Sequence, residues 1–202
     1  MSRANVLSGQ VFGKVDWVTS DSREFGMFVR TSQRESSRVV VSGPEAERLL
    51  ANGVIQKGMM AEAHGTFYAR AQKRHDTGAY MGELVCDAQS VLAEAHRDDR
   101  FRSSIYGNMK AVVMYWDPSS AQLKTFFNYT EPGRPKQMTC SLHMKSWLDG
   151  MSAESQERFK ASLRVGREFT AQALIEVSCY RNRDGDHVPS LMLLPTHFSL
   201  QG

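Results

Sequence analysis

Cysteine is scarce in this chain of 202 residues, and Cys86, Cys140 and Cys179 each stand alone in a strand-like run. An odd number of isolated cysteines predicts neither a disulfide framework nor a CxxC metal site. Long hydrophobic runs are lacking too, and none approaches the roughly 20 apolar residues of a membrane-spanning helix. The first residues have no apolar core behind their basic residue. We therefore expect no secretory signal, no membrane partner and a reducing, cytoplasmic setting.

Motifs of catalysis are also lacking. The sequence contains no HExxH, GxxxxGK[ST], GxGxxG or GxSxG pattern, and its six histidines are dispersed. Residues 183–187 read Arg-Asp-Gly-Asp-His, but the downstream glutamate of a calcium loop is missing. Asp-Gly is instead a common hairpin turn. We expect no enzyme, no cofactor and no bound metal.

A strong charge of one sign is absent as well, because 25 Lys and Arg against 22 Asp and Glu give a net charge of +3. This small excess permits contact with a polyanion without requiring it, since clustering of charge matters more than its sum. The content of 41% hydrophobic and 23% charged residues is that of a globular protein. Its length predicts one or two domains.

Period-two alternation, typical of half-buried strands, is what the chain has in abundance. It runs through residues 5–18, where Gly9 and Gly13 favour strong bending. It continues in residues 25–31, where Phe25 and Phe28 fall on opposite faces. The remaining elements expected in this half are a strand at 38–41, a short helix from 44 and a long hairpin of strands 59–70 and 80–92.

The same order of elements recurs about 110 residues later, where Ala171-Gln172-Ala173 matches Ala61-Glu62-Ala63. The expected elements of this half are strands at 105–116, 123–130 and 137–145, a helix at 152–163 and a hairpin at 166–200. We predict one domain at residues 1–95, a linker at 96–104 and a second domain at 105–202.

Five strands with one helix between the third and the fourth is the element order of the OB-fold, a partly open barrel. The predicted fold class is all-β with one helix per domain, as two tandem OB-fold-like five-stranded barrels. In its Gly9/Gly13 opening strand, residues 25–31 and the hairpin around Lys73-Arg74, the chain resembles the single-stranded-DNA-binding protein family. This family includes bacterial SSB and the related primosomal replication protein. Its acidic C-terminal tail has no counterpart in residues 196–202, which puts a recruiting role in doubt.

The resemblance implies binding by cations that follow the backbone and by aromatic faces on which bases stack. OB-folds place such residues on strands two and three and on the loops joining strands one–two and four–five. The candidates of the first half are Phe12, Lys14, Phe28, Arg30, Arg38, Tyr68, Arg70, Lys73, Arg74, His75 and Tyr80. A merely solvated hairpin tip remains the alternative for Lys73 and Arg74. Trp17 shares parity with Val11 and Val15, which predicts a place in the core.

The candidates of the second half are Trp116, Lys124, Phe126, Arg134, Lys136, Tyr180, Arg181 and Arg183. Trp116 fits barrel closure as well as stacking. Phe126 and Phe127 are adjacent, so one of them is expected outside the barrel. The turn at 184–186 carries two acids, which predicts weaker binding by this half or a role in dimerisation.

The resemblance therefore implies a non-catalytic, largely sequence-independent single-stranded DNA-binding protein, acting in replication, recombination or transfer of a plasmid- or phage-like element. One alternative is a protein–protein interaction module in a replication or transfer complex, with an exposed apolar patch around Phe126, Phe127 and Trp147. RNA binding is the other, since OB-folds serve both nucleic acids. Edge strands in both barrels predict a homodimer or tetramer.

Overall fold

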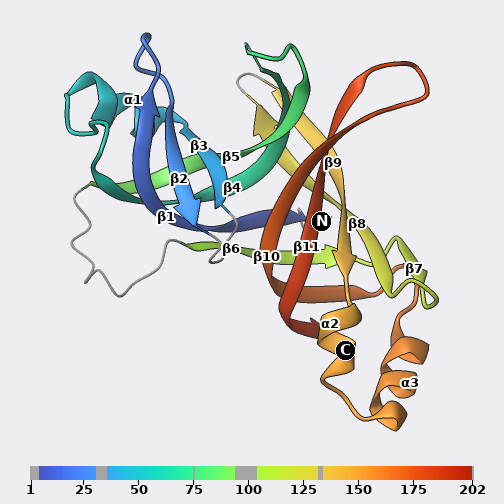
Figure 1. The fold of residues 1–202 in the computed structure, drawn as a ribbon. Helices are drawn as coiled ribbons and strands as arrows, with labels where there is room; N and C mark the ends of the chain where they lie inside the picture. The colour runs from blue at the N-terminus through green and yellow to red at the C-terminus, as the bar shows by residue number, and fades with distance from the viewer. Residues whose placement is uncertain (1–4, 31–35, 75, 94–103, 132–133, 202) are drawn as a thin grey trace. The chain divides into compact units, whose positions relative to one another are not determined.

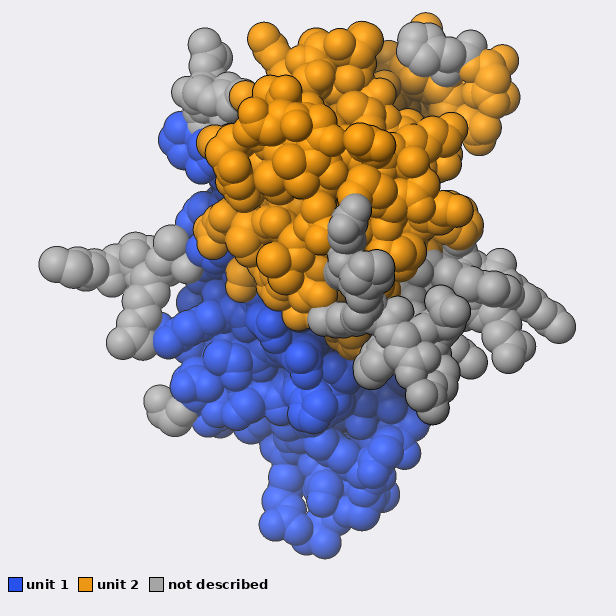
Figure 2. All heavy atoms as spheres, turned by 90° about the vertical axis from the view of Figure 1, so that its left-hand side faces the viewer, with its two compact units in different colours: residues 1–7, 107–178, 190–202 blue, residues 8–106, 179–189 orange. Residues whose placement is uncertain are grey.

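The computed structural model describes residues 5–30, 36–74, 76–93, 104–131 and 134–201. The chain divides into two compact units, one of residues 8–106 with 179–189 and one of residues 1–7, 107–178 and 190–202 (Figure 2). We call the barrel of the former the N-terminal barrel and that of the latter the C-terminal barrel. The predicted linker at 96–104 lies outside the described residues except for Ser104, and the domain boundaries stay a prediction.

The N-terminal barrel is a ring of five strands, as predicted (Figure 1). Its elements are β1 (Val6–Val18), β2 (Phe25–Arg30), β3 (Ser36–Ser42), α1 (Pro44–Ala51), β4 (Met60–Lys73) and β5 (Tyr80–Ala93). Antiparallel pairs join β1 to β2, β2 to β3, β1 to β4 and β4 to β5. The ring is completed by β3 and β5, which run parallel. Helix α1 stands between the third and fourth strands and packs on β3 and β5.

Alternation along β2 decides which side chains fill this barrel. Phe25, Met27 and Val29 are fully buried, whereas Phe28 between them is 45% exposed. Tight curvature depends on Gly13, where an added Cβ would lie 2.6 Å from the carbonyl oxygen of Phe28. It depends also on Gly65, where the register of β4 and β5 shifts and a Cβ would lie 2.1 Å from the Asp87 carbonyl oxygen. Only glycine allows strands to approach this closely.

The C-terminal barrel repeats this topology with its first strand divided in two. Its strands are β6 (Ser104–Val112), β7 (Tyr115–Asp117), β8 (Gln122–Glu131), β9 (Arg134–His143), β10 (Glu168–Arg181) and β11 (His187–Leu200). Pairing follows the order β6–β10–β11–β9–β8–β7, and β9 and β11 are the parallel pair. Phe127, Leu142, Phe169 and Leu191 are fully buried in its core. The two tandem OB-fold-like barrels expected from the sequence are thus present.

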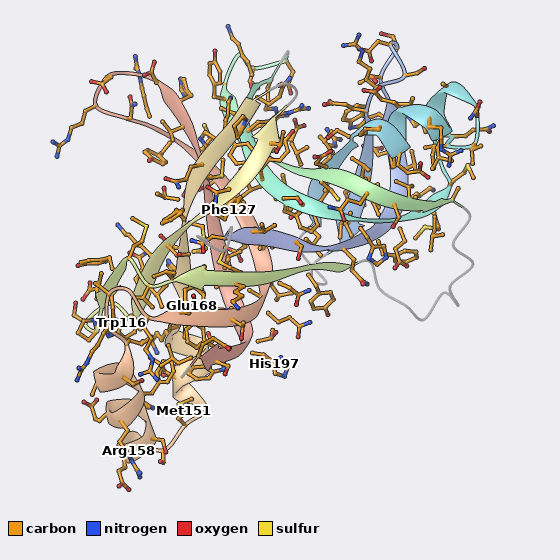
Figure 3. The ribbon with its side chains drawn as sticks, turned by 180° about the vertical axis from the view of Figure 1, so that it is seen from behind. Trp116, Phe127, Met151, Arg158, Glu168 and His197 are labelled. Carbon is orange, nitrogen blue, oxygen red and sulfur yellow. The ribbon has the colours of Figure 1, made fainter. Side chains whose placement is uncertain are left out.

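The helical segment of the C-terminal barrel differs from the expected single helix at 152–163. It has two helices, α2 (Lys145–Asp149) and α3 (Ala153–Ser162), and Figure 3 labels Met151 between them and Arg158 on α3. Ser152 caps α3 by accepting a hydrogen bond from the Ser155 amide. Trp147 of α2 lies 4.7 Å from Phe159 of α3 and 5.7 Å from Phe198 of β11, between ring centroids. These aromatic contacts tie the short helices to the sheet.

Candidate nucleic-acid interface

Three predicted residues form a row across the outer face of neighbouring strands. Lys14 of β1 lies opposite Phe28 of β2, and Phe28 lies opposite Arg38 of β3. Lys14 is exposed, Phe28 is 45% exposed, and the Arg38 side chain is 53% exposed. An exposed aromatic ring is thereby flanked on both sides by cations.

Trp17 joins this face, and its assignment to the core was wrong. The pairing of β1 with β2 shifts between Val15 and Trp17, so the extra residue of a β-bulge reverses the parity of the residues after it. Trp17 then lies opposite Gly26, where an added Cβ would be 2.0 Å from the indole Nε1. Since Gly26 has the outward parity of Phe28, the indole covers the outer side of β2. We call Lys14, Trp17, Phe28 and Arg38 the aromatic–basic face.

Arg38 forms an ion pair with Asp16. Its Nη2 lies 2.9 Å from the Asp16 Oδ2, and the two side chains are 53% and 36% exposed. Exposed ion pairs of this kind contribute about 0–1 kcal/mol. The guanidinium can therefore exchange the carboxylate for a phosphate at little cost.

The β4–β5 hairpin presents further predicted residues at its turn. Lys73 and Tyr80 are directly opposite each other and exposed. Lys14 and Lys73 make no ion pair within the part of the chain that the structure describes. Arg74 donates hydrogen bonds from Nε and Nη2 to the two carboxylate oxygens of Asp76, at 3.0 and 2.7 Å. These hydrogen bonds lower the pKa of Asp76. The predicted His75 lies outside the described residues.

The Tyr80 ring already has a stacking partner. His187 lies parallel to it, with ring centroids 3.9 Å apart and planes 10° apart, and both residues belong to the same compact unit. Tyr80 is nevertheless 43% exposed. A flat, partly exposed ring pair of this type offers a surface on which a base can stack.

Arg70, predicted to contact nucleic acid, is instead engaged by two carboxylates. Its Nη1 and Nη2 each lie 2.8 Å from an oxygen of Glu24, and its Nε lies 2.7 Å from Glu83. The side chain is only 28% exposed. The hydrogen bonds that it donates to Glu24, and then the one to Glu83, raise its pKa above the ordinary value. It is a structural residue in this conformation.

Phe12 and Tyr68 were expected on a polar face, and that expectation was wrong. Phe12 is 2% exposed and Tyr68 3% exposed. Both have outward parity, but the outer surface of the barrel is itself covered at these positions, as the fully buried Val40 and Val85 on β3 and β5 also indicate. Alternation predicts on which face of the sheet a side chain lies. It does not predict whether other parts of the protein cover that face, and where they do, residues of both parities are buried.

A smaller aromatic and basic group occurs on the C-terminal barrel. Lys124 of β8 lies opposite Tyr115 of β7, and its Nζ is 5.7 Å from the centre of that ring. Tyr115, missed in the sequence, is 51% exposed. Phe126 is half-buried and Phe127, labelled in Figure 3, is fully buried, so one of the pair does lie inside. Trp116 lies opposite the buried Leu123, which matches a role in barrel closure.

The remaining candidates lie on β9, on the β10–β11 hairpin and at the end of β2. Arg181 donates to the Gly185 carbonyl at 3.0 Å, and Tyr180, Arg183 and Lys136 are exposed. The side chains of Arg30 and Arg134 lie outside the described part of the structure.

In the described ranges no three His, Cys, Asp or Glu side chains come together as metal ligands. None of the helices in those ranges has the length and apolar character needed to cross a bilayer. Cys86, Cys140 and Cys179 are free thiols, and burial raises the pKa of both Cys86 and Cys140 to about 12.

Comparison with known proteins gives a fold. No protein-family description matches this chain, and no curated protein matches it in sequence. Among solved structures, the wild-type single-stranded DNA binding protein from Thermus aquaticus superposes with a TM-score of 0.50 at 10% identity, covering 99% of this chain and 95% of that one. A deletion mutant of the same protein gives 0.51 at 11% identity, covering 98% and 96%.

The chain therefore has the tandem OB-fold architecture, and over nearly its whole length this is the fold of a single-stranded DNA binding protein. At identities of 10% and 11% the likeness concerns the path of the backbone. The aromatic–basic face is a property of this chain's own residues.

Proposed function

We propose that this protein binds single-stranded DNA, without catalysing a reaction, across the aromatic–basic face of its N-terminal barrel. The observation that carries the proposal is the row Lys14–Phe28–Arg38, with Trp17 on the same face. Cations provide contacts to successive phosphates, and exposed rings provide stacking surfaces that accept any base. The fold supports the same choice, because OB-folds bind oligonucleotides on strands two and three.

Binding is proposed to be largely independent of sequence. The face offers ring surfaces and charges, and these recognise features that all nucleotides share. Replication, recombination or transfer of a plasmid- or phage-like element is the proposed setting, in the cytoplasm, and self-association into a dimer or tetramer stays a prediction. Lys124, Tyr115 and Phe126 make the C-terminal barrel a second, less basic contact.

The proposal is tested by fluorescence anisotropy with a labelled dT oligonucleotide, a DNA duplex and an RNA of matching length, each at two salt concentrations. We expect the dT oligonucleotide to bind best and its affinity to fall with salt. Tighter binding of RNA would favour the RNA alternative. No binding to any of the three would overturn the proposal.

Phe28→Ala is the decisive variant. Loss of a stacking ring is expected to weaken dT binding by about 1–3 kcal/mol, which is roughly 5- to 150-fold in Kd. Lys73→Ala should lower the slope of log Kd against log salt by about 0.7, the share of one phosphate contact on a single strand. Leu92→Ala removes a 58% exposed apolar side chain of β5 and is the matched control, expected to bind like the parent. Equal affinities for Phe28→Ala and Leu92→Ala would exclude this face.

The protein-interaction alternative predicted an exposed apolar patch around Phe126, Phe127 and Trp147, and two of these residues are packed against other side chains. Phe127 is fully buried, and Trp147 packs on Phe159 and Phe198. Phe126, the third residue of the predicted patch, is half-buried. We therefore put nucleic-acid binding first.

A further inference from the structure

The ion cluster of Glu24, Arg70 and Glu83 joins two segments that are distant in the chain. Arg70 makes three charged hydrogen bonds of 2.7–2.8 Å, two of them to the single carboxylate of Glu24. The side chains are 28%, 24% and 13% exposed for Arg70, Glu24 and Glu83. Paired, partly buried guanidinium–carboxylate contacts of this geometry are among the stronger charge-assisted hydrogen bonds.

Each partner belongs to a segment bordering the aromatic–basic face. Arg70 and Glu83 lie opposite each other on β4 and β5, three rungs from the Lys73–Tyr80 pair at the hairpin turn. Glu24 ends the β1–β2 loop (residues 19–24) that connects Trp17 and Phe28 along the chain. The cluster thus holds the hairpin to that loop.

The loop end of this connection is held by hydrogen bonds around Thr19. The Thr19 hydroxyl accepts from the amides of Arg23 and Glu24, at 3.2 and 3.0 Å, and donates to the Glu24 carbonyl at 2.9 Å. The Thr19 amide donates to the same carbonyl. Movement of Glu24, which directly precedes β2, is therefore coupled to Thr19, which directly follows β1.

The charge of the cluster argues against a direct phosphate contact. One guanidinium against two carboxylates leaves a net charge of −1, and all three guanidinium nitrogens have carboxylate partners. A phosphate near Arg70 would meet two negative groups at close range, which is unfavourable.

The C-terminal barrel has no equivalent cluster among its described residues. There Asp117 bonds within its own turn, to the Ser119 amide and to the hydroxyls of Ser119 and Ser120. The β10–β11 turn, which belongs to the compact unit of the N-terminal barrel, closes on itself through the hydrogen bond from Arg181 to the Gly185 carbonyl. Among the described residues, a charged connection between loop and hairpin occurs in the barrel that carries the richer face.

We propose that Arg70 is a positioning residue, which acts through Glu24 and Glu83 to hold Lys73 and Tyr80 of the hairpin at a fixed distance from Trp17 and Phe28. This inference rests on the proposed binding of single-stranded DNA. It assigns Arg70 no contact with the ligand.

Glu24→Gln separates this role from a direct contact, because the two predict opposite signs. If Arg70 positions the hairpin, losing its bidentate partner weakens dT binding, by roughly tenfold for a lost charge-assisted pair. If Arg70 contacts phosphate, removing a competing carboxylate strengthens binding. Tighter binding by Glu24→Gln would overturn the proposal.

Glu45→Gln is the matched control. Glu45 forms the same kind of bidentate pair, with Arg48 on α1, at 2.9 and 2.8 Å. Its replacement makes the same change in charge outside the cluster, so dT affinity should match that of the parent.

Hydrogen exchange gives a measurement that needs no DNA. In Glu24→Gln the hairpin amides of Arg74 and Gly78, bonded to the carbonyls of Ala79 and Arg74, should exchange faster, while Glu45→Gln leaves them unchanged. Unchanged exchange in Glu24→Gln would overturn the positioning role. If the parent protein binds no oligonucleotide, the proposed function fails, and this exchange result still decides whether the cluster holds the hairpin.

Discussion

The two rings of the aromatic–basic face are held in different ways. Phe28 projects from the middle of β2 between Lys14 and Arg38 and depends on strand alternation alone. Trp17 depends on a neighbour, since its indole occupies the space in which Gly26 would carry a side chain. Gly26 is therefore a residue of the candidate site although it offers no functional group.

Gly26→Ala should displace Trp17. The new Cβ would meet the indole Nε1 at 2.0 Å, and moving the indole off its preferred rotamer costs of order 1 kcal/mol. We expect a shifted Trp17 indole resonance in NMR spectra and weaker dT binding, with the fold retained. Gly150→Ala is the control, because there the nearest atom lies 3.5 Å away. An unshifted indole resonance in Gly26→Ala would contradict this role of Gly26.

Among the elements, the two turns that follow the first strand of each barrel are stabilised differently. The β1–β2 loop is held by Thr19 and linked to the hairpin through Glu24 and Arg70. The β7–β8 turn depends on Asp117, whose pKa is lowered to about 2, first by the hydroxyl of Ser119 and then by that of Ser120. One turn is thus coupled to a distant element and the other is local.

The double variant Ser119→Ala and Ser120→Ala should raise the Asp117 pKa toward its ordinary value of 3.8. In the parent the folded-state pKa is the lower one, so the carboxylate stabilises the turn above about pH 4. That stabilisation is lost as the pH falls through about 2. Carboxyl titration by NMR measures the change. A pKa that stays near 2 in the double variant would show that other groups hold the carboxylate.

At the scale of the whole molecule, the start of the chain belongs with the C-terminal barrel. Asn5 is buried, its Nδ2 donates to the Phe126 carbonyl at 3.1 Å, and its own carbonyl accepts from the Asn128 amide at 2.7 Å. A compact unit here is therefore assembled from separate stretches of sequence. The domains predicted at 1–95 and 105–202 are contiguous stretches, which would assign Asn5 to the first domain. The structure instead groups Asn5 with the C-terminal barrel.

Asn5→Ala should destabilise the protein by about 1 kcal/mol, because the side-chain hydrogen bond to a partly buried carbonyl is lost. Urea denaturation measures the change. Ser8→Ala removes an exposed hydroxyl of β1, three residues further along the chain, so its effect should stay within about 0.5 kcal/mol. Equal stability of the two variants would exclude a structural role for the Asn5 side chain.

Much of the fold could be predicted from the sequence because its signals are local. Alternation placed Phe25, Met27 and Val29 inside and Phe28 outside, and the order of strands and helix identified the barrel. Lys14 and Phe28 followed from the same alternation, whereas the place of Arg38 opposite Phe28 follows from the pairing of β2 with β3. Helix α2 was missed because its five residues continue a strand-like run and are too few for a helical period to be recognised.

The sequence by itself determined the two barrels and the outward parity of Lys14 and Phe28, since both depend on a period of two residues. The pairing of the strands then aligned these residues with Arg38 in a row. Only the tertiary structure decided the places of Trp17, Phe12, Tyr68 and Arg70. A bulge reverses parity without a distinct sequence signal, and the burial of an outer face depends on the elements that pack over it. Arg70 finds Glu24 across 46 residues of sequence, and such a pairing exists only once the barrel has closed.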